Sequence, residues 1–206
     1  MKKIVIIVGG VVLILAGWYF FFTKKVDITN MPPKNETVVV FGDSLAEGVG
    51  ATEENDLASL IAKTTGKAVI NHGKSGDTTR DALGRVSQVL EKDPGVVLMI
   101  LGGNDVLKKI PKEETFQNLE KMIRFFQDKG SVVILVGVRS GVVGDGRGDD
   151  YQALAQKTGS VYVSDILQDV FGKRQYMSDA VHPNDAGYAV IEKRLSSIIM
   201  ELFDNR

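Results

Sequence analysis

A serine and a histidine, far apart in the chain, stand in settings that favour acyl-transfer chemistry. Ser44 follows the short β-branched run Thr37–Phe41 after a glycine-containing turn, so its hydroxyl is expected at the edge of a sheet. Asp179 precedes His182 by three residues, in a turn restrained by a following proline. The carboxylate can hold the imidazole through Nδ1–H and leave Nε2 free to accept a proton. Taken singly, a helix-capping serine and a surface turn with a capping histidine are the alternatives.

Two glycine-containing segments could supply hydrogen-bond donors to the same place. Gly102-Gly103-Asn104-Asp105 follows the apolar run Val96–Leu101, and Asn104 offers a side-chain amide at a strand end. Gly73, after the run Ala68–Ile70, could supply a backbone N–H. An oxyanion that forms on a tetrahedral intermediate needs two or three such donors. Either segment alone is also ordinary turn material.

A regular alternation of strands and helices must position these motifs. Short apolar runs predict five strands, at Thr37–Phe41, Ala68–Ile70, Val96–Leu101, Val132–Val136 and Val161–Val163. Apolar residues at helical spacing predict helices over Asp56–Lys63, Thr78–Leu90, Thr115–Lys129 and Ala186–Phe203. Uninterrupted apolar strands that alternate with helices predict an α/β domain with a parallel sheet covered on both faces. The ligand site of such a sheet lies beyond the carboxyl ends of its strands.

Together and in this order, the motifs resemble the GDSL, or SGNH, hydrolase family, over roughly Thr37 to Phe203. The resemblance is carried by Gly42-Asp43-Ser44-Leu45, Gly73 within Asn71-His72-Gly73-Lys74-Ser75-Gly76-Asp77-Thr78, Gly102-Gly103-Asn104-Asp105, and Asp179-Ala180-Val181-His182-Pro183. It is closest to the small arylesterase, thioesterase and lysophospholipase branch. It implies a flavodoxin-like three-layer α/β/α domain with a five-stranded parallel sheet.

The resemblance also implies a division of roles. Ser44 would be the nucleophile and His182 the base, oriented by Asp179, and the oxyanion donors would be the Ser44 and Gly73 N–H groups and the Asn104 side chain. The reaction would be hydrolysis of carboxylic or thio-esters, small or lipid-derived, through an acyl-serine intermediate, without metal or organic cofactor. A carbohydrate or peptidoglycan O-acetyl esterase is the alternative among enzymes. A non-catalytic binding module that has kept the fold is the alternative outside them.

Four further residues are predicted to bind or line the substrate. Asp43 precedes the serine, His72 precedes the glycine of the second block, and Asp105 follows the amide donor. Arg139 opens the glycine-containing segment Arg139–Asp150, which is either a flap over the acyl group or a solvated loop. A basic residue interrupts the acidic pattern of this segment, so it does not predict a calcium site.

The start of the chain predicts a membrane anchor. Ile4–Phe22 is uncharged and has paired lysines on both sides; as a helix it would span about 28 Å, close to the ~30 Å hydrocarbon thickness. The lysines before it favour a hydrolase domain outside the cytoplasm. A signal peptide cleaved near Ile14-Leu15-Ala16, and a buried helix, are the alternatives. The predicted organisation is an anchor over 1–23, a linker over 24–36 and the hydrolase domain over 37–206.

Composition limits the partners and the chemistry. The chain has 206 residues, 44% apolar and 25% charged, which is globular composition with room for one ordinary domain. Its net charge of −1 gives no basic footprint for nucleic acid. The absence of cysteine excludes disulfides, thiolate metal sites and a cysteine nucleophile. No P-loop or dinucleotide fingerprint supports a nucleotide-binding function. The expected partners are an acyl-ester substrate and a membrane, and the oligomeric state stays open.

Overall fold

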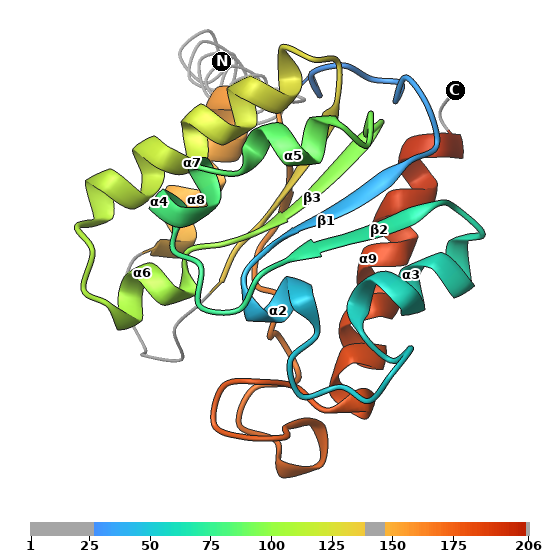
Figure 1. The fold of residues 1–206 in the computed structure, drawn as a ribbon, viewed down its shortest axis with the longest axis vertical. Helices are drawn as coiled ribbons and strands as arrows, with labels where there is room; N and C mark the ends of the chain where they lie inside the picture. The colour runs from blue at the N-terminus through green and yellow to red at the C-terminus, as the bar shows by residue number, and fades with distance from the viewer. Residues whose placement is uncertain (1–26, 139–146, 205–206) are drawn as a thin grey trace, which may run out of the picture.

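The computed structural model describes residues 27–138 and 147–204. The predicted anchor and Arg139 therefore lie outside the described residues. Within those residues, no helix is both long and apolar enough to cross a membrane. The described chain forms a twisted central sheet with helices packed on both of its faces (Figure 1).

The sheet has five parallel strands in the order β2-β1-β3-β4-β5. They are β1 (Val38–Gly42), β2 (Val69–Gly73), β3 (Val96–Ile100), β4 (Val132–Val136) and β5 (Val161–Val163). Every residue of β1, β3 and β4 is buried, which explains their uninterrupted apolar sequences. From β1 the chain passes to β2 on one side and then returns to β3 on the other. The carboxyl ends of β1 and β3 are thus the switch point at which such sheets bind ligands.

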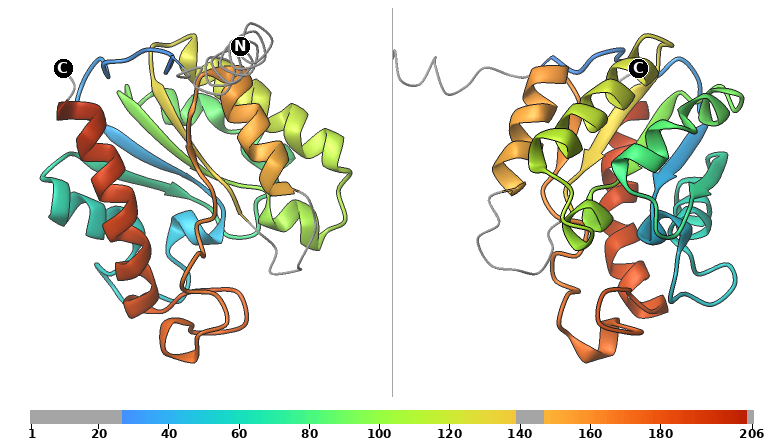
Figure 2. Two further views of the ribbon diagram at one scale, coloured as in Figure 1. Left: turned by 180° about the vertical axis from the view of Figure 1, so that it is seen from behind. Right: turned by 60° about the vertical axis from the view of Figure 1, so that its left-hand side comes forward.

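Two helical layers cover the sheet, as Figure 2 shows. The helices are α2 (Ser44–Glu47), α3 (Leu57–Thr65), α4 (Thr79–Leu83), α5 (Val86–Leu90), α6 (Gly103–Leu107), α7 (Lys112–Gln127), α8 (Arg147–Thr158) and α9 (Asp185–Asp204), with a 3₁₀ turn at Arg174–Tyr176. Alternate strand residues feed two cores: Val38 and Val40 pack with α3 and α9, while Val39 and Phe41 pack with α4, α5, α7 and α8. The predicted three-layer α/β architecture with a five-stranded parallel sheet is confirmed.

The helices differ from the prediction in two places. The segment Thr78–Leu90 is two short helices, because the chain leaves helical geometry at Arg85, whose φ is −124°. Helix α8 was not predicted, since its first turn lies in the polar, glycine-containing segment Arg139–Asp150. Its inward side, which includes Tyr151 and Leu154, is buried against the sheet.

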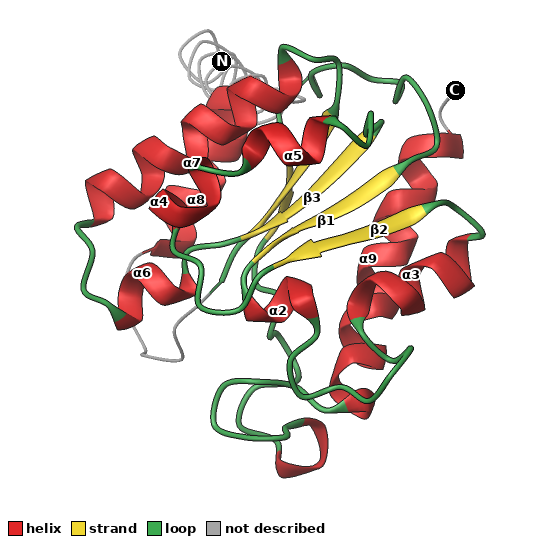
Figure 3. Ribbon diagram, in the orientation of Figure 1, coloured by secondary structure: helices red, strands yellow, loops and turns green. Residues whose placement is uncertain are grey.

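The described part of the predicted linker packs against the folded domain. The Thr29 N–H donates to Gly159 O at 2.9 Å, and Asn30 Nδ2 donates to Gln127 O at 2.7 Å and to Ser131 O at 3.1 Å. This segment lies at the amino ends of the strands, and the loops at their carboxyl ends lie at the opposite end of the sheet (Figure 3). Residues 27–36 are therefore attached to the domain at the end remote from the candidate site.

Candidate active site

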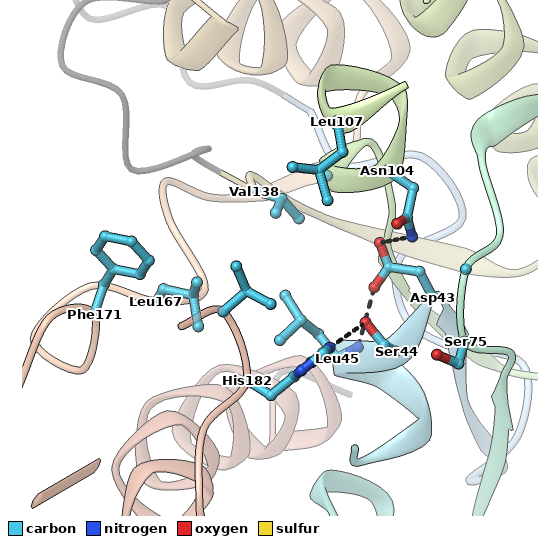
Figure 4. Close-up of a pocket in the computed structure, with 13 residues that line it drawn as sticks. Asp43, Ser44, Leu45, Ser75, Asn104, Leu107, Val138, Leu167, Phe171 and His182 are labelled. Atoms are coloured by element: carbon cyan, nitrogen blue, oxygen red, sulfur yellow. Dashed lines mark hydrogen bonds between the residues drawn. The ribbon is translucent and has the colours of Figure 1, made fainter. Parts of the chain in front are cut away.

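A pocket opens at the carboxyl ends of the central strands, with a cavity volume of about 200 Å³. Its polar side is formed by Asp43, Ser44, Asn104 and His182, which come from the end of β1, from α2, from α6 and from the loop before α9 (Figure 4). Most of the residues predicted from sequence to do chemistry therefore meet in one place.

Ser44 owes its position to the turn that follows β1. A Cβ atom on Gly42 would lie 2.0 Å from Ile100 O, so only glycine allows this approach between the ends of β1 and β3. Asp43 then caps α2 by accepting the Leu45 N–H at 3.1 Å, which makes Ser44 the first residue of that helix. The serine hydroxyl is thereby presented at the sheet edge.

Ser44, His182 and Asp179 form one chain of hydrogen bonds. Ser44 Oγ lies 3.1 Å from His182 Nε2, and His182 Nδ1 lies 2.7 Å from Asp179 Oδ2. The second carboxylate oxygen of Asp179 accepts the N–H groups of Val181 and His182, both at 2.8 Å. The hydrogen bond from the His182 side chain, followed by these two backbone bonds, lowers the pKa of Asp179 to about 2. The carboxylate is therefore ionised and fixed in orientation at neutral pH.

The amide groups of residues 74–79 identify a donor that the sequence analysis missed. Five of these six N–H groups donate to acceptors of the protein, namely Gly42 O, Glu47 Oε2, Lys74 O, Asp81 Oδ2 and Asp105 Oδ2. The N–H of Gly76 has no acceptor within the described parts of the chain, and neither has the N–H of Ser44. Gly76 has a φ of +82° and lines the pocket beside Ser44. Two backbone donors without an acceptor in the described residues therefore belong to residues that line the same pocket.

The structure corrects the prediction that Gly73 is an oxyanion donor. Its N–H donates to Asn71 Oδ1 at 2.9 Å, and the residue lines a separate hollow. A Cβ atom there would lie 2.0 Å from Glu47 N, so this glycine lets α2 pack on the end of β2. Gly76 in the same block is the glycine that reaches the pocket, and only the loop conformation distinguishes the two.

Asn104 and Asp43 face each other at the pocket wall. Asn104 Nδ2 donates to Asp77 O at 3.0 Å and lies 3.5 Å from Asp43 Oδ2. Asp43 is only 2% exposed, and this burial raises the pKa of its carboxyl to about 7, against the lowering effect of the Leu45 N–H. The predicted site residue Asp43 is therefore beside the pocket, in a setting that favours its protonated form.

The structure places two of the predicted substrate-binding residues outside the pocket. Asp105 is fully buried and accepts hydrogen bonds from Thr79 N, Thr79 Oγ1 and Thr115 Oγ1, so it ties α6 to α4 and α7. His72 lines the separate hollow, where its Nδ1 lies 3.2 Å from a guanidinium nitrogen of Arg85. Among the described residues, no cluster of three or more acidic or histidine side chains could hold a metal ion.

The pocket also has an apolar wall that was not predicted from the sequence. Across the pocket from the polar groups stand Leu107, Val138, Leu167 and Phe171 (Figure 4). Val181, next to His182, lines the same pocket. Leu107, Phe171 and Val181 are 67%, 42% and 42% exposed, so this side of the pocket continues into an accessible apolar rim.

Comparison with known proteins identifies the family to which this site belongs. Residues 40–190 match the GDSL-like lipase/acylhydrolase family, and the chain is a member of that family. It is 32% identical over 161 residues to an arylesterase of Vibrio mimicus. The aligned region covers 72% of this chain and 80% of that protein. It is 29% identical over 160 residues to the esterase TesA of Pseudomonas aeruginosa, with the same coverages.

A solved structure agrees with these sequence relatives. The crystal structure of TesA superposes with a TM-score of 0.76 at 27% identity, covering 81% of this chain and 99% of that one. The predicted family and its arylesterase and thioesterase branch are confirmed. The protein is an ester-cleaving hydrolase of this family.

The burial of Asp43 predicts a specific pH dependence of stability. Because its pKa is raised to about 7, the native state binds the proton more tightly than the unfolded chain between about pH 4 and about pH 7. The carboxyl therefore lowers the free energy of unfolding as the pH rises through this window. In Asp43→Asn this contribution is absent, so the free energy of unfolding of the variant, relative to wild type, should rise by on the order of 3 kcal/mol from about pH 4 to about pH 8.

Urea denaturation followed by circular dichroism at a series of pH values measures this difference. Any constant offset between the proteins reports lost hydrogen bonds and is subtracted. Parallel pH profiles for the variant and the wild type would show that Asp43 titrates normally.

Proposed function

We propose that Ser44 is the nucleophile of ester hydrolysis and that His182 is its general base. The 3.1 Å contact between Ser44 Oγ and His182 Nε2 carries this proposal. With its proton on Nδ1, directed at Asp179, the imidazole accepts the serine proton at Nε2 while Oγ attacks the acyl carbon. The imidazolium then donates this proton to the leaving alcohol or thiol. Water, deprotonated by the same imidazole, then attacks the acyl carbon, and the imidazolium returns the proton to Ser44 Oγ as the bond between Oγ and the acyl carbon breaks and the acid is released.

The ionised carboxylate of Asp179 stabilises the imidazolium that forms at each step. It does so from 2.7 Å, and its own orientation is fixed by two backbone N–H groups. A pKa of about 2 means that the carboxylate does not take up the proton at neutral pH. Its role is to set the tautomer and orientation of the ring.

The oxyanion hole in this proposal consists of the N–H groups of Ser44 and Gly76 and the side-chain amide of Asn104. The two backbone groups have no acceptor in the described parts of the chain, so they are available to bind the oxyanion of a tetrahedral intermediate. Asn104 Nδ2 keeps one hydrogen on Asp77 O and has only the long contact to Asp43 for the other. Donors fixed before the reaction stabilise the developing charge without reorganisation.

The apolar wall favours hydrocarbon esters over acetylated glycans. A glycan would need several polar partners at the rim, whereas Leu107, Phe171 and Val181 offer only apolar surface there. The cavity of about 200 Å³ is smaller than the ~300 Å³ lower bound of drug-sized sites, so a long chain would extend over the exposed rim. This supports an acyl ester of small or lipid-derived type as the substrate. The unbroken series of hydrogen bonds from Ser44 through His182 to Asp179 argues against a binding module without catalysis.

The N-terminal anchor is part of this proposal on sequence grounds alone. As a helix, Ile4–Phe22 would match the thickness of a bilayer, and the described residues begin shortly after the flanking lysines. The domain would be held outside the cytoplasm by this segment.

Replacement of the nucleophile tests the mechanism. We expect Ser44→Ala to lower kcat/KM for p-nitrophenyl esters by a factor on the order of 10⁴ to 10⁶, because no other hydroxyl of the described residues is hydrogen-bonded to His182 Nε2. His182→Ala should be similarly impaired. A fluorophosphonate probe should label the wild type and not Ser44→Ala. Ser59→Ala, at a partly buried serine of α3 outside the pocket, serves as a control that retains activity. Full activity of Ser44→Ala would refute the proposed mechanism.

The apolar rim predicts a chain-length effect. Phe171→Ala should lower kcat/KM for p-nitrophenyl octanoate about five- to twentyfold, because covering the exposed part of the Phe171 ring with a hydrocarbon chain contributes about 1–2 kcal/mol to binding. The value for p-nitrophenyl acetate should stay within about twofold. Met200→Ala removes an apolar side chain of the same exposure, 42%, outside the pocket and should change neither value. An equal loss on both esters would show that Phe171 does not contact the chain.

The anchor predicts accessibility from outside the cell. Protease added to intact cells should digest the hydrolase domain, and the full-length protein should remain in washed membranes. A domain that resists external protease in intact cells would contradict the orientation. A protein released without its first residues would identify a cleaved signal peptide.

A further inference from the structure

A buried arginine lies behind the pocket and has no role in the mechanism above. The Arg85 side chain is 10% exposed and stacks on the ring of Phe41 at 4.6 Å. Its Nε donates to Asp77 Oδ2 at 2.6 Å, one terminal nitrogen donates to Gly42 O at 2.8 Å, and the other donates to His72 O at 2.9 Å and lies 3.2 Å from His72 Nδ1. Each of the three guanidinium nitrogens therefore donates a hydrogen bond to a different segment of the chain.

These segments are the ones that must be aligned for catalysis. Gly42 ends β1 directly before the turn that presents Ser44, and its carbonyl also accepts the Lys74 N–H at 2.9 Å. Asp77 follows Gly76 in the loop after β2. Arg85 thus connects the strand end that carries the nucleophile to the loop that carries the free amide.

Asp77 extends the connection to the second donor of the oxyanion hole. Its carboxylate binds Arg85, and its backbone oxygen accepts Asn104 Nδ2 at 3.0 Å. A shift of Asp77 would therefore move both the amide of Gly76, one residue away, and the side chain of Asn104. Neither donor contacts Arg85 directly.

The backbone break at Arg85 and the burial of its ion pair with Asp77 are both locally unfavourable, and only the connection between these segments accounts for them. Arg85 interrupts the helix between α4 and α5, and its charge and that of Asp77 are both taken out of water. A buried ion pair is weak support for stability, because desolvation offsets much of the attraction. Departures from local structural preference of this kind concentrate at functional sites. A planar guanidinium that satisfies three acceptors at fixed angles suits alignment, and a lysine ammonium cannot reproduce that geometry.

We propose that Arg85 is a positioning residue for the oxyanion hole. By binding Asp77, it fixes the positions of Gly76 N–H and Asn104 Nδ2 relative to Ser44. This inference rests on the proposed function of the same site. Because the donors bind the tetrahedral intermediate more strongly than the planar ester, displacing them lowers kcat and leaves KM nearly unchanged.

The test compares Arg85→Lys, which keeps the charge, with Arg85→Ala in the full-length protein. We expect kcat for p-nitrophenyl esters to fall about tenfold to a hundredfold in Arg85→Lys, with KM within about threefold of wild type. Inactivation by a p-nitrophenyl phosphonate, which forms a tetrahedral adduct, should slow by a similar factor. Methylguanidinium should restore part of the kcat of Arg85→Ala, and methylammonium should not.

Val89→Ala is the matched control, because Val89 is a fully buried residue of α5 outside this network. It should lose stability without losing kcat at a temperature where circular dichroism shows it folded. Asp77→Asn serves as a further variant that weakens the same contact. An unchanged kcat in whichever of these network variants folds, or a kcat loss in Val89→Ala equal to that in Arg85→Lys, would overturn the proposal.

If none of the network variants folds, Arg85 serves stability and the positioning role is rejected. Ser44→Ala, measured beside these variants, distinguishes failure of the proposed function from failure of the positioning role of Arg85. Activity in Ser44→Ala refutes the proposed function itself, whereas an inactive Ser44→Ala with fully active Arg85 variants refutes only the positioning role.

Discussion

The active site depends on how closely the carboxyl ends of three parallel strands approach their neighbours. Side chains are excluded at two of these ends: a Cβ atom would meet Ile100 O at 2.0 Å on Gly42 and Glu47 N at 2.0 Å on Gly73. Because both positions are glycine, α2 can lie directly over the ends of β1 and β2. The hydroxyl of Ser44 and the loop that contains Gly76 then reach the same small volume. The site is thus a consequence of backbone packing before any side-chain chemistry is considered.

Three carboxyl groups are buried near the site, and each has different hydrogen-bonding surroundings. Asp77 is paired with Arg85, Asp105 accepts hydrogen bonds from a backbone amide and two hydroxyls, and Asp43 is left with a raised pKa of about 7. Full ionisation of Asp43 beside a developing oxyanion would oppose the reaction by like-charge repulsion. Its burial favours the neutral form as the pH falls below about 7. The acidic residues of the site therefore support the donors that surround the oxyanion without adding three full negative charges.

Much of this arrangement could be predicted from sequence, because strand burial leaves a strong signal. The apolar runs at Val132–Val136 and Val161–Val163 coincide with β4 and β5, and Ser44 and His182 were identified from residue type and setting. The choice between Gly73 and Gly76 could not be made, since both glycines belong to one block and only the loop geometry separates them. The apolar wall was also missed, because its side chains come from the end of α6 and from loops whose mutual positions depend on the tertiary fold.

The two helices that were predicted wrongly or missed also depend on tertiary contacts that the local sequence does not show. Arg85 breaks the helix predicted over Thr78–Leu90 in order to reach carbonyl groups at the ends of β1 and β2, which are distant in sequence. A tertiary interaction overrides local helical preference at this residue. The start of α8 was likewise hidden, because its packing on the sheet contributes more than the propensity of its polar first turn.

A crystal structure of the protein inactivated by a phosphonate ester would test the proposed nucleophile and oxyanion hole directly. We expect a covalent bond between phosphorus and Ser44 Oγ. We also expect the phosphoryl oxygen to accept hydrogen bonds from the N–H groups of Ser44 and Gly76 and from Asn104 Nδ2, with His182 Nε2 facing the leaving-group side. A phosphoryl oxygen directed into solvent or toward Gly73, or a phosphonate attached to another residue, would contradict it.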